Sequence, residues 1–300
     1  MALNISFMGG DSRLFYALQK ILIMPAFADY SIKCFHLSYP ENALEQLIKL
    51  HPHRITICRN MSQLFEDCKM LICPVPFTRD GIQVYTEDTS ETISIPDFMS
   101  HETLPERIIG GGFPKYFIHS ISQSSTKIYD IMKDDSFVAK NAELTGEGLL
   151  KYMIGNTPVT ISHAHILIAG YGRCGKVIAE KLSVLEGNIT ILDHDDTAIR
   201  TASEKGYTVF DPKKFDGSPL PFDMIVNTIP TPVLKAPLLR KLKGSCRIFD
   251  IASSPGGFDE DVCKGLSLKV IKCPGIPGKT APASAGYAIA ECAERFFISS

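Results

Sequence analysis

A chain of 300 residues has room for two domains, because a single hydrophobic core stops growing near about 250–300 residues. With 45% hydrophobic and 21% charged residues and a net charge of −2, its composition is that of a globular protein and excludes a basic surface for nucleic acid. No hydrophobic run approaches the about 18 residues of a membrane span, and the first residues lack the basic region of a signal peptide, so the sequence predicts a cytoplasmic protein that does not bind membranes.

The first half of the chain alternates short β-rich runs with amphipathic helical stretches. Predicted strands cover residues 3–8, 32–37, 55–58 and 70–73, and predicted helices cover residues 11–24 and 43–50. This alternation is typical of a parallel sheet with helical crossovers. The stretch 74–114 is rich in proline, glycine and threonine, which predicts long loops with one or two short strands.

The second half repeats the alternation more regularly, after a predicted helix at residues 144–154 that Gly155-Asn156-Thr157-Pro158 ends. Six strands are predicted there, at residues 165–169, 188–192, 207–210, 223–227, 246–251 and 268–273. Six strands with intervening helices match one dinucleotide-binding unit. A last predicted helix, residues 280–297, is long enough to return and pack on the first domain.

These elements predict an α/β protein of two domains, with an N-terminal flavodoxin-like or Rossmann-like parallel sheet and a C-terminal doubly wound Rossmann domain. The N-terminal domain is expected to cover residues 1–142 together with the C-terminal helix at 280–300. Residues 143–157 are expected to form an interdomain helix and linker, and residues 158–279 the Rossmann domain. The nine cysteines have no C-x-x-C spacing, so we expect free thiols and no metal site.

A glycine-rich loop, Gly170-Tyr171-Gly172-Arg173-Cys174-Gly175, follows the first strand of the second domain. In such a GxGxxG pattern the first glycine permits a tight turn, the second lets the backbone approach a pyrophosphate, and the third lets the helix pack closely. The phosphates then lie at the N-terminus of the next helix, whose free N–H groups and dipole favour an anion. The strand–turn–helix context predicts that these six residues bind a nicotinamide dinucleotide.

Asp193 ends the next predicted strand and lies 18 residues after Gly175, close to the about 20 residues expected for the acid that binds the cofactor ribose. A carboxylate there accepts hydrogen bonds from the 2′-hydroxyl and repels a 2′-phosphate, and Asp195 and Asp196 add to the repulsion. The sequence therefore favours NAD over NADP. The alternative is that these acids cap the next helix.

Two further loops follow strands at the sheet edge where ligands of open α/β sheets bind. Asn227-Thr228-Ile229-Pro230 follows the fourth strand, and the segment Asp250-Ile251-Ala252-Ser253-Ser254-Pro255-Gly256-Gly257 follows the fifth. We expect the nicotinamide end of the cofactor to contact Asn227, Thr228, Ile229, Pro230, Ala252 and Ser253. The alternative is ordinary turn chemistry, to which proline, glycine and asparagine are equally suited.

Taken together, these and other motifs make the chain resemble the dipicolinate synthase A-subunit family, whose enzyme makes pyridine-2,6-dicarboxylate in spore-forming bacteria. The resemblance runs over nearly the whole length. Its motifs are Met8-Gly9-Gly10-Asp11-Ser12-Arg13, Leu71-Ile72-Cys73-Pro74-Val75, Thr145-Gly146-Glu147-Gly148, the glycine loop, the two strand-end loops, and Pro274-Gly275-Ile276-Pro277-Gly278-Lys279-Thr280-Ala281-Pro282 with Ala285-Gly286.

The resemblance implies oxidation of a reduced cyclic dipicolinate precursor, dihydrodipicolinate or its hydrated form, with hydride transfer to a nicotinamide cofactor. It also implies that the protein has a flavoprotein-like partner, the B subunit of the same enzyme. The family usually carries Ala-Arg-Ser-like residues after the second Rossmann strand, which suits a 2′-phosphate. This chain has Asp193-His194-Asp195-Asp196 instead, so NAD and NADP both stay candidates and Asp193 favours NAD.

A dicarboxylate substrate requires cations or helix N-termini in its site. Ser12 and Arg13 open the first helix, and Lys279 follows a Pro-Gly loop where the chain returns between the domains. We expect these three residues to bind the substrate, although each cation alone fits an ordinary surface charge. For catalysis the candidates are Lys279 and Glu147, which begins the interdomain helix and is either the general base or a carboxylate favoured in a first helical turn.

Two other classes of protein stay open on the sequence. One is another two-domain NAD-dependent dehydrogenase, of the alanine-dehydrogenase or shikimate-dehydrogenase kind, which substrate profiling would distinguish. The other is a nicotinamide-binding regulatory protein without turnover of its own. A homo-oligomer is compatible with each of these classes.

Overall fold

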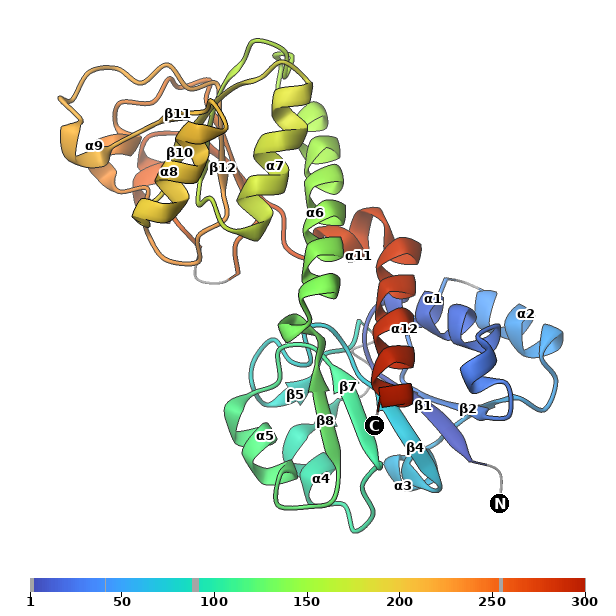
Figure 1. Ribbon diagram of the computed structural model, residues 1–300. Coiled ribbons are helices and arrows are strands. Elements are labelled where there is room, and N and C mark those ends of the chain that lie inside the picture. Colours follow the sequence, from blue (N-terminus) through green and yellow to red (C-terminus); the bar gives the residue numbers. More distant parts are fainter. Residues whose placement is uncertain (1–2, 41, 88–91, 254–255, 300) are drawn as a thin grey trace. The chain divides into compact units, whose positions relative to one another are not determined.

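The computed structural model describes residues 3–40, 42–87, 92–253 and 256–299, and the chain falls into two compact units (Figure 1). The first unit comprises residues 1–140 and 281–300, and the second comprises residues 141–280. Residues 143–157, expected as a linker, lie within the second unit. Among the helices of the described ranges, none is long and apolar enough to cross a membrane.

The first unit is built around a six-stranded parallel sheet with the order β3-β2-β1-β4-β7-β8. Its strands are β1 (Asn4–Met8), β2 (Ser31–Phe35), β3 (Ile55–Ile57), β4 (Cys68–Ile72), β7 (Arg107–Gly110) and β8 (Lys127–Asp130). This is the strand order of a Rossmann sheet, so of the two folds predicted for this domain the Rossmann type is the observed one. Two short strands, β5 (Gln83–Val84) and β6 (Ile93–Ser94), form a separate antiparallel pair.

Residues 74–114 are predicted as long loops with one or two short strands, whereas their described part contains three short strands, β5, β6 and β7, and the helix α4 (Ile95–Met99). β7 joins the sheet through Ile108 and Ile109, which pair with β4 and are fully buried. β7 runs directly into Gly110-Gly111-Gly112, which is typical of a loop, so the strand is stabilised by pairing and burial that the local sequence does not show.

Helices α1 (Ser12–Leu22) and α12 (Pro282–Ser299) lie side by side in the first unit (Figure 1). Gly286 permits this contact, because a Cβ atom there would overlap the carbonyl oxygen of Arg13. α12 begins two residues later than the predicted helix, since proline fits a first helical position. The other helical segments of this unit are η1 (Pro25–Phe27), α2 (Ala43–Leu50), α3 (Met61–Phe65), α5 (Lys115–Ile121) and η2 (Ile131–Lys133).

Asp134 links helix α12 to the carboxyl end of strand β8 through hydrogen bonds. Its Oδ2 accepts hydrogen bonds from the Tyr129 hydroxyl at 2.6 Å and from Arg295 Nη2 at 3.0 Å, and its Oδ1 accepts one from the Phe137 N–H at 2.7 Å. Burial tends to raise the pKa of the Asp134 carboxyl, but these hydrogen bonds outweigh it and hold the pKa at about 2. The ionised carboxylate therefore stabilises this end of the first unit.

We expect Asp134→Asn to lower the free energy of unfolding by about 1–2 kcal/mol at neutral pH. Because the folded-state pKa lies below the unfolded value of 3.8, the carboxylate contributes this stability above about pH 4 and loses it as the pH falls toward 2. Urea unfolding of wild type and variant across that range is the measurement, with the exposed Asp29→Asn as control. A difference that does not change with pH would contradict this assignment.

The second unit holds another six-stranded parallel sheet, with the order β11-β10-β9-β12-β13-β14. Its strands are β9 (His165–Ala169), β10 (Asn188–Leu192), β11 (Thr208–Val209), β12 (Met224–Asn227), β13 (Arg247–Asp250) and β14 (Lys269–Lys272). All six overlap the strands that the sequence predicts, and their order confirms the doubly wound Rossmann domain. Its helical segments include α7 (Arg173–Val184), α8 (Asp196–Glu204), η3 (Pro212–Lys214), α9 (Ala236–Leu239), α10 (Glu260–Gly265) and α11 (Ile276–Thr280).

Helix α6 (Asp135–Asn156) begins nine residues before the predicted helix at 144–154. Asp134 caps its first turn by accepting the hydrogen bond from Phe137 N–H. The three glycines within the helix lower its intrinsic propensity. The predicted start is wrong because the cap and tertiary contacts stabilise a longer helix.

Candidate functional site

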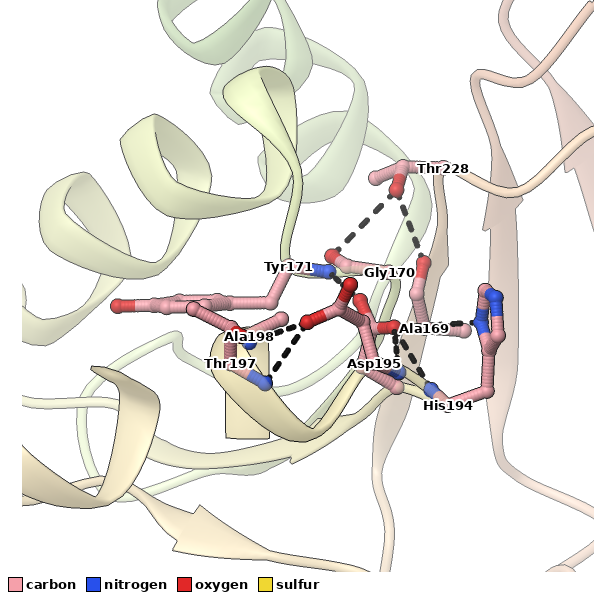
Figure 2. Close-up of polar contacts among 9 residues, drawn as sticks. Ala169, Gly170, Tyr171, His194, Asp195, Thr197, Ala198 and Thr228 are labelled. Atoms are coloured by element: carbon pink, nitrogen blue, oxygen red, sulfur yellow. Dashed lines mark hydrogen bonds and ion pairs between the residues drawn. The ribbon is translucent and has the colours of Figure 1, made fainter. Parts of the chain in front are cut away.

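The glycine loop lies at the carboxyl end of β9, a central strand of the second sheet, and runs directly into α7. Gly170 has a φ of +97°, and a Cβ atom there would overlap the hydroxyl of Thr228. That hydroxyl donates to the carbonyl oxygens of Ala169 at 3.0 Å and of Gly170 at 3.4 Å (Figure 2). Glycine at this position is therefore required by the tight turn.

Gly172 and Gly175 differ in their surroundings. A Cβ atom at Gly175 would overlap the carbonyl oxygen of Gly170, so only glycine lets α7 pack this close to the loop. A Cβ atom at Gly172 would meet no described atom within 4 Å, and its φ of −75° is open to any residue. The backbone of Gly172 faces open space, as required where a pyrophosphate approaches the loop.

The N-terminus of α7 fits an anion. Among the described residues, no side chain caps it, so the N–H groups of its first turn have no side-chain acceptor there. The dipole of its 12 residues also favours negative charge. Tyr171 is only 2% exposed, and its N–H donates to Asp193 Oδ2. Arg173 is exposed and Cys174 is half-buried at the start of the helix. These residues fit the phosphates of a dinucleotide.

Asp193 follows β10 and lies beside the glycine loop. Its Oδ2 accepts a hydrogen bond from the Tyr171 N–H at 2.6 Å, and its Oδ1 accepts from the N–H groups of His194 and Asp195 at 2.7 and 3.0 Å. Asp195, and not Asp193, caps α8 by accepting from the first N–H groups of that helix (Figure 2). The Asp193 carboxylate is thus held against the loop, where the ribose of a dinucleotide is expected.

Asn227 and Asp250 form a buried hydrogen-bonded pair at the ends of β12 and β13. Asn227 Nδ2 donates to Asp250 Oδ1 at 2.7 Å, and the Ala252 N–H donates to the same oxygen at 3.3 Å. Burial raises the pKa of the Asp250 carboxyl above its ordinary value, and these hydrogen bonds only partly offset it. A Cβ atom at Gly257 would overlap the Asn227 side chain, so that glycine makes room for the pair.

The other residues predicted at the nicotinamide end lie around this pair. Thr228 packs against Gly170, and Asn227 also donates to the carbonyl oxygen of Ile229 at 2.9 Å. Pro230 and Ser253 are exposed. The fold therefore gathers the glycine loop and both strand-end loops at one edge of the second sheet, while the Asn227 side chain itself is fully buried. Ser254 and Pro255 of the second loop lie outside the described residues.

The Thr145-Gly146-Glu147-Gly148 motif packs helices together. A Cβ atom at Gly146 would come within 3.0 Å of the Lys181 side chain on α7, and one at Gly148 would overlap Ile276 and Thr280 of α11. Glu147 lies in the interior of α6, not in its first turn, is 66% exposed, and pairs with Lys181 Nζ at 3.2 Å. The motif thus has a structural explanation, and a catalytic role of Glu147 stays a prediction.

The three predicted substrate residues have different surroundings. Lys279 is exposed on α11 in the second unit. Arg13 is 7% exposed, and its guanidinium donates two hydrogen bonds of 2.7 Å to Asp11 and a further one to the carbonyl oxygen of Val75. Ser12, at the start of α1, lines a pocket of the first unit. Ser12 is therefore accessible to a ligand, whereas Arg13 is already paired.

The sequence does not indicate two residues that the structure places at candidate binding sites. The sequence places Asp250 only within a loop motif, although a carboxylate at the end of a buried strand is itself typical of a site residue. Arg59 lines the same pocket as Ser12. It lies after β3, a strand of only three residues. Because the sequence does not show that this strand lies beside β2, nothing indicates that Arg59 shares a site with Ser12.

Two Rossmann-type sheets and the glycine loop define a two-domain α/β protein whose second domain has a fold of the nicotinamide-binding type. Residues 4–132 match the family of N-terminal domains of the dipicolinate synthase A subunit, and residues 166–214 match the TrkA-N domain. Over 289 residues the chain is 24% identical to the A subunit of dipicolinate synthase from Bacillus subtilis strain 168, and the match covers 96% of this chain and 93% of that protein. These matches confirm the resemblance of the chain to the dipicolinate synthase A-subunit family.

Solved structures share this fold. The A subunit of dipicolinate synthase from Bacillus halodurans has a TM-score of 0.79 at 22% identity, covering 98% of this chain and 97% of that one. The corresponding subunit from Bacillus subtilis has the same TM-score and identity, covering 100% and 97%. A transhydrogenase from Sinorhizobium meliloti has a TM-score of 0.64 at 12% identity, covering 99% and 94%.

Proposed function

We propose that this protein is a dipicolinate synthase A-subunit-like oxidoreductase, which oxidises dihydrodipicolinate or its hydrated form to dipicolinate. The observation that carries the proposal is the similarity, along 96% of the chain, to the A subunit of dipicolinate synthase. The glycine loop supports it, because the loop is open at Gly172 and followed by an uncapped helix. In the oxidation of dihydrodipicolinate, a ring carbon loses a hydride and a neighbouring atom loses a proton, which makes the ring aromatic; the hydrated form must also lose a water molecule.

A nicotinamide dinucleotide, when bound, supplies the hydride acceptor. The N–H groups at the start of α7 would hold its phosphates, and Asp193 would bind its ribose. The strand-end loops after β12 and β13 would lie along its nicotinamide end. These residues orient the cofactor; the chain needs no nucleophile for hydride transfer.

The departing proton needs a base. We favour Asp250 for this role over Glu147, because Asp250 ends a strand at the ligand-binding edge and burial raises the pKa of its carboxyl. Glu147 is 66% exposed and ion-paired with Lys181, which gives its carboxylate no special reactivity. A raised pKa makes Asp250 a stronger base than an ordinary surface carboxylate.

The decisive experiment measures reduction of NAD and of NADP by the purified chain with freshly formed dihydrodipicolinate. Parallel reactions include the proposed partner, a flavoprotein-like B subunit, or replace the substrate by alanine or shikimate. Reduced nicotinamide formed only with the dipicolinate precursor supports the proposal. Turnover of alanine or shikimate instead would identify another dehydrogenase, and cofactor binding without turnover under any of these conditions would identify a regulatory protein.

We expect NAD to bind more tightly than NADP, because the Asp193 carboxylate beside the glycine loop repels a 2′-phosphate. A difference of about 1–3 kcal/mol corresponds to roughly 5- to 150-fold in affinity. Asp193→Asn should reduce this preference by weakening NAD and relieving the repulsion of NADP. Fluorescence titration of both cofactors is the measurement.

Glu204→Gln is the matched control, because this acid is exposed at the far end of α8, away from the glycine loop. It should leave the preference nearly unchanged. Tighter binding of NADP by the wild type would show that the ribose does not approach Asp193.

A further inference from the structure

The first unit contains a pocket of about 820 Å³ at the carboxyl ends of β1, β2 and β3. Open α/β sheets bind ligands at this edge, and the volume is typical of small-molecule sites. Its lining includes Ser12, Ser38, Tyr39, Ile57 and Arg59. The sheet around it has the Rossmann strand order, so its ligand must first be distinguished from a second dinucleotide.

The glycine turn of this unit is closed to phosphate. The Gly10 N–H donates to the Tyr85 carbonyl oxygen at 2.7 Å, and the Gly10 carbonyl oxygen accepts from the Glu87 N–H at 3.0 Å. The segment after β5 therefore occupies the position where a pyrophosphate approaches such a loop. Asp11 caps α1 with its carboxylate, which places a negative charge at that helix N-terminus. A dinucleotide is excluded from this turn because both backbone groups of Gly10 are already hydrogen-bonded and the Asp11 carboxylate, paired with Arg13, already caps α1.

The pocket offers unpartnered hydrogen-bond donors. Within the described ranges, the Arg59 guanidinium makes no ion pair or hydrogen bond, and the same is true of the hydroxyls of Ser12 and Ser38. Glu87 also lines the pocket, but it has interactions of its own. A free guanidinium with nearby hydroxyls is suited to a carboxylate, which it can bind through two parallel hydrogen bonds.

The walls of the pocket are apolar and partly uncovered. Tyr39 is 47% exposed and Ile57 is 51% exposed, although both line a concave surface. The Tyr39 ring contacts Phe15, with ring centroids 6.4 Å apart. Large apolar side chains left exposed in a pocket are available to a ligand, and an aromatic ring offers a flat face to a planar partner.

We propose that this pocket binds a small planar ring that carries a carboxylate, with Arg59 and Ser12 on the carboxylate and Tyr39 against the ring. The inference rests on the proposed function for the choice of probe, pyridine-2,6-dicarboxylate. It assigns the ring carboxylate to Arg59, a residue that the sequence did not indicate, and not to the buried Arg13.

Calorimetric titration of pyridine-2,6-dicarboxylate into the full chain tests this assignment. Arg59→Gln and Tyr39→Ala should each weaken binding at least tenfold, because one removes the charge and the other the ring contact. Lys49→Gln, which removes an exposed cation of α2 that does not line the pocket, should bind like the wild type. Circular dichroism of each variant confirms folding.

Three results would overturn the assignment. The first is wild-type affinity for the probe in both pocket variants, and the second is no binding of the probe by the wild type. The third is a nucleotide site, shown by AMP binding more strongly than the probe and losing affinity in Arg59→Gln. The first leaves the proposed function standing with a different substrate site. If the probe binds as expected but dihydrodipicolinate does not reduce either nicotinamide, the pocket stands and the proposed function fails.

Discussion

Gly172→Val is expected to weaken binding of NAD or NADP by at least about 100-fold, or nearly 3 kcal/mol, while the protein stays folded. A Cβ atom at this position meets no described atom within 4 Å, and the backbone has a φ of −75°, so valine causes no clash with the protein itself. Its side chain instead occupies the space in front of α7, where the phosphates would otherwise accept hydrogen bonds from backbone N–H groups. Losing one or two such bonds to a charged group accounts for the expected effect.

Two glycine variants make this experiment specific. Gly244→Val is the matched control, because a Cβ atom there also meets nothing within 4 Å but the residue lies away from the loop in sequence, before β13. Gly175→Ala should destabilise the fold, since its Cβ overlaps the carbonyl oxygen of Gly170. Unchanged cofactor affinity in a folded Gly172→Val protein, measured by fluorescence titration, would exclude this loop as the phosphate site.

Each strand of the second sheet could be predicted because its hydrophobic run and the turn that ends it are adjacent in the sequence. The core of β9, Ile166 to Ala169, is a run of buried hydrophobic residues followed at once by the glycine loop. In the first unit the same reasoning misses β7, which runs directly into Gly110-Gly111-Gly112, and β8, which is only partly buried. These strands are stabilised by neighbours distant in sequence, which no local pattern displays.

The candidate site likewise has a part that the local sequence predicts and a part that depends on contacts distant in sequence. The structural demands on Gly170 and Gly175 follow from a backbone path within a few residues, and the structure has the close contacts that both require. The surroundings of Glu147 and Arg13 depend on Lys181 and on the carbonyl oxygen of Val75, which lie far away in the sequence. Spacing alone therefore identifies the glycine loop but does not distinguish a free cation from a paired one.

Arg13→Ala is expected to destabilise the first unit by about 3–5 kcal/mol, because it leaves the Asp11 carboxylate buried without its partner. The two side chains are 8% and 10% exposed and share two hydrogen bonds of 2.7 Å. The sequence alone suggests a different result, a loss of dicarboxylate binding in an otherwise stable protein. The buried ion pair makes the loss of stability the larger effect.

Urea unfolding, with hydrogen exchange of β1 and α1 as a local probe, measures this cost. The double variant Asp11→Asn with Arg13→Met should recover part of the lost stability, because it removes both charges and keeps the aliphatic volume of the arginine. Folded Arg13→Ala protein should bind pyridine-2,6-dicarboxylate with nearly wild-type affinity. The conclusion would be reversed if Arg13→Ala kept wild-type stability and lost dicarboxylate binding tenfold. Arg13 would then exchange Asp11 for the substrate carboxylate, and the ion pair would exist only in the absence of substrate.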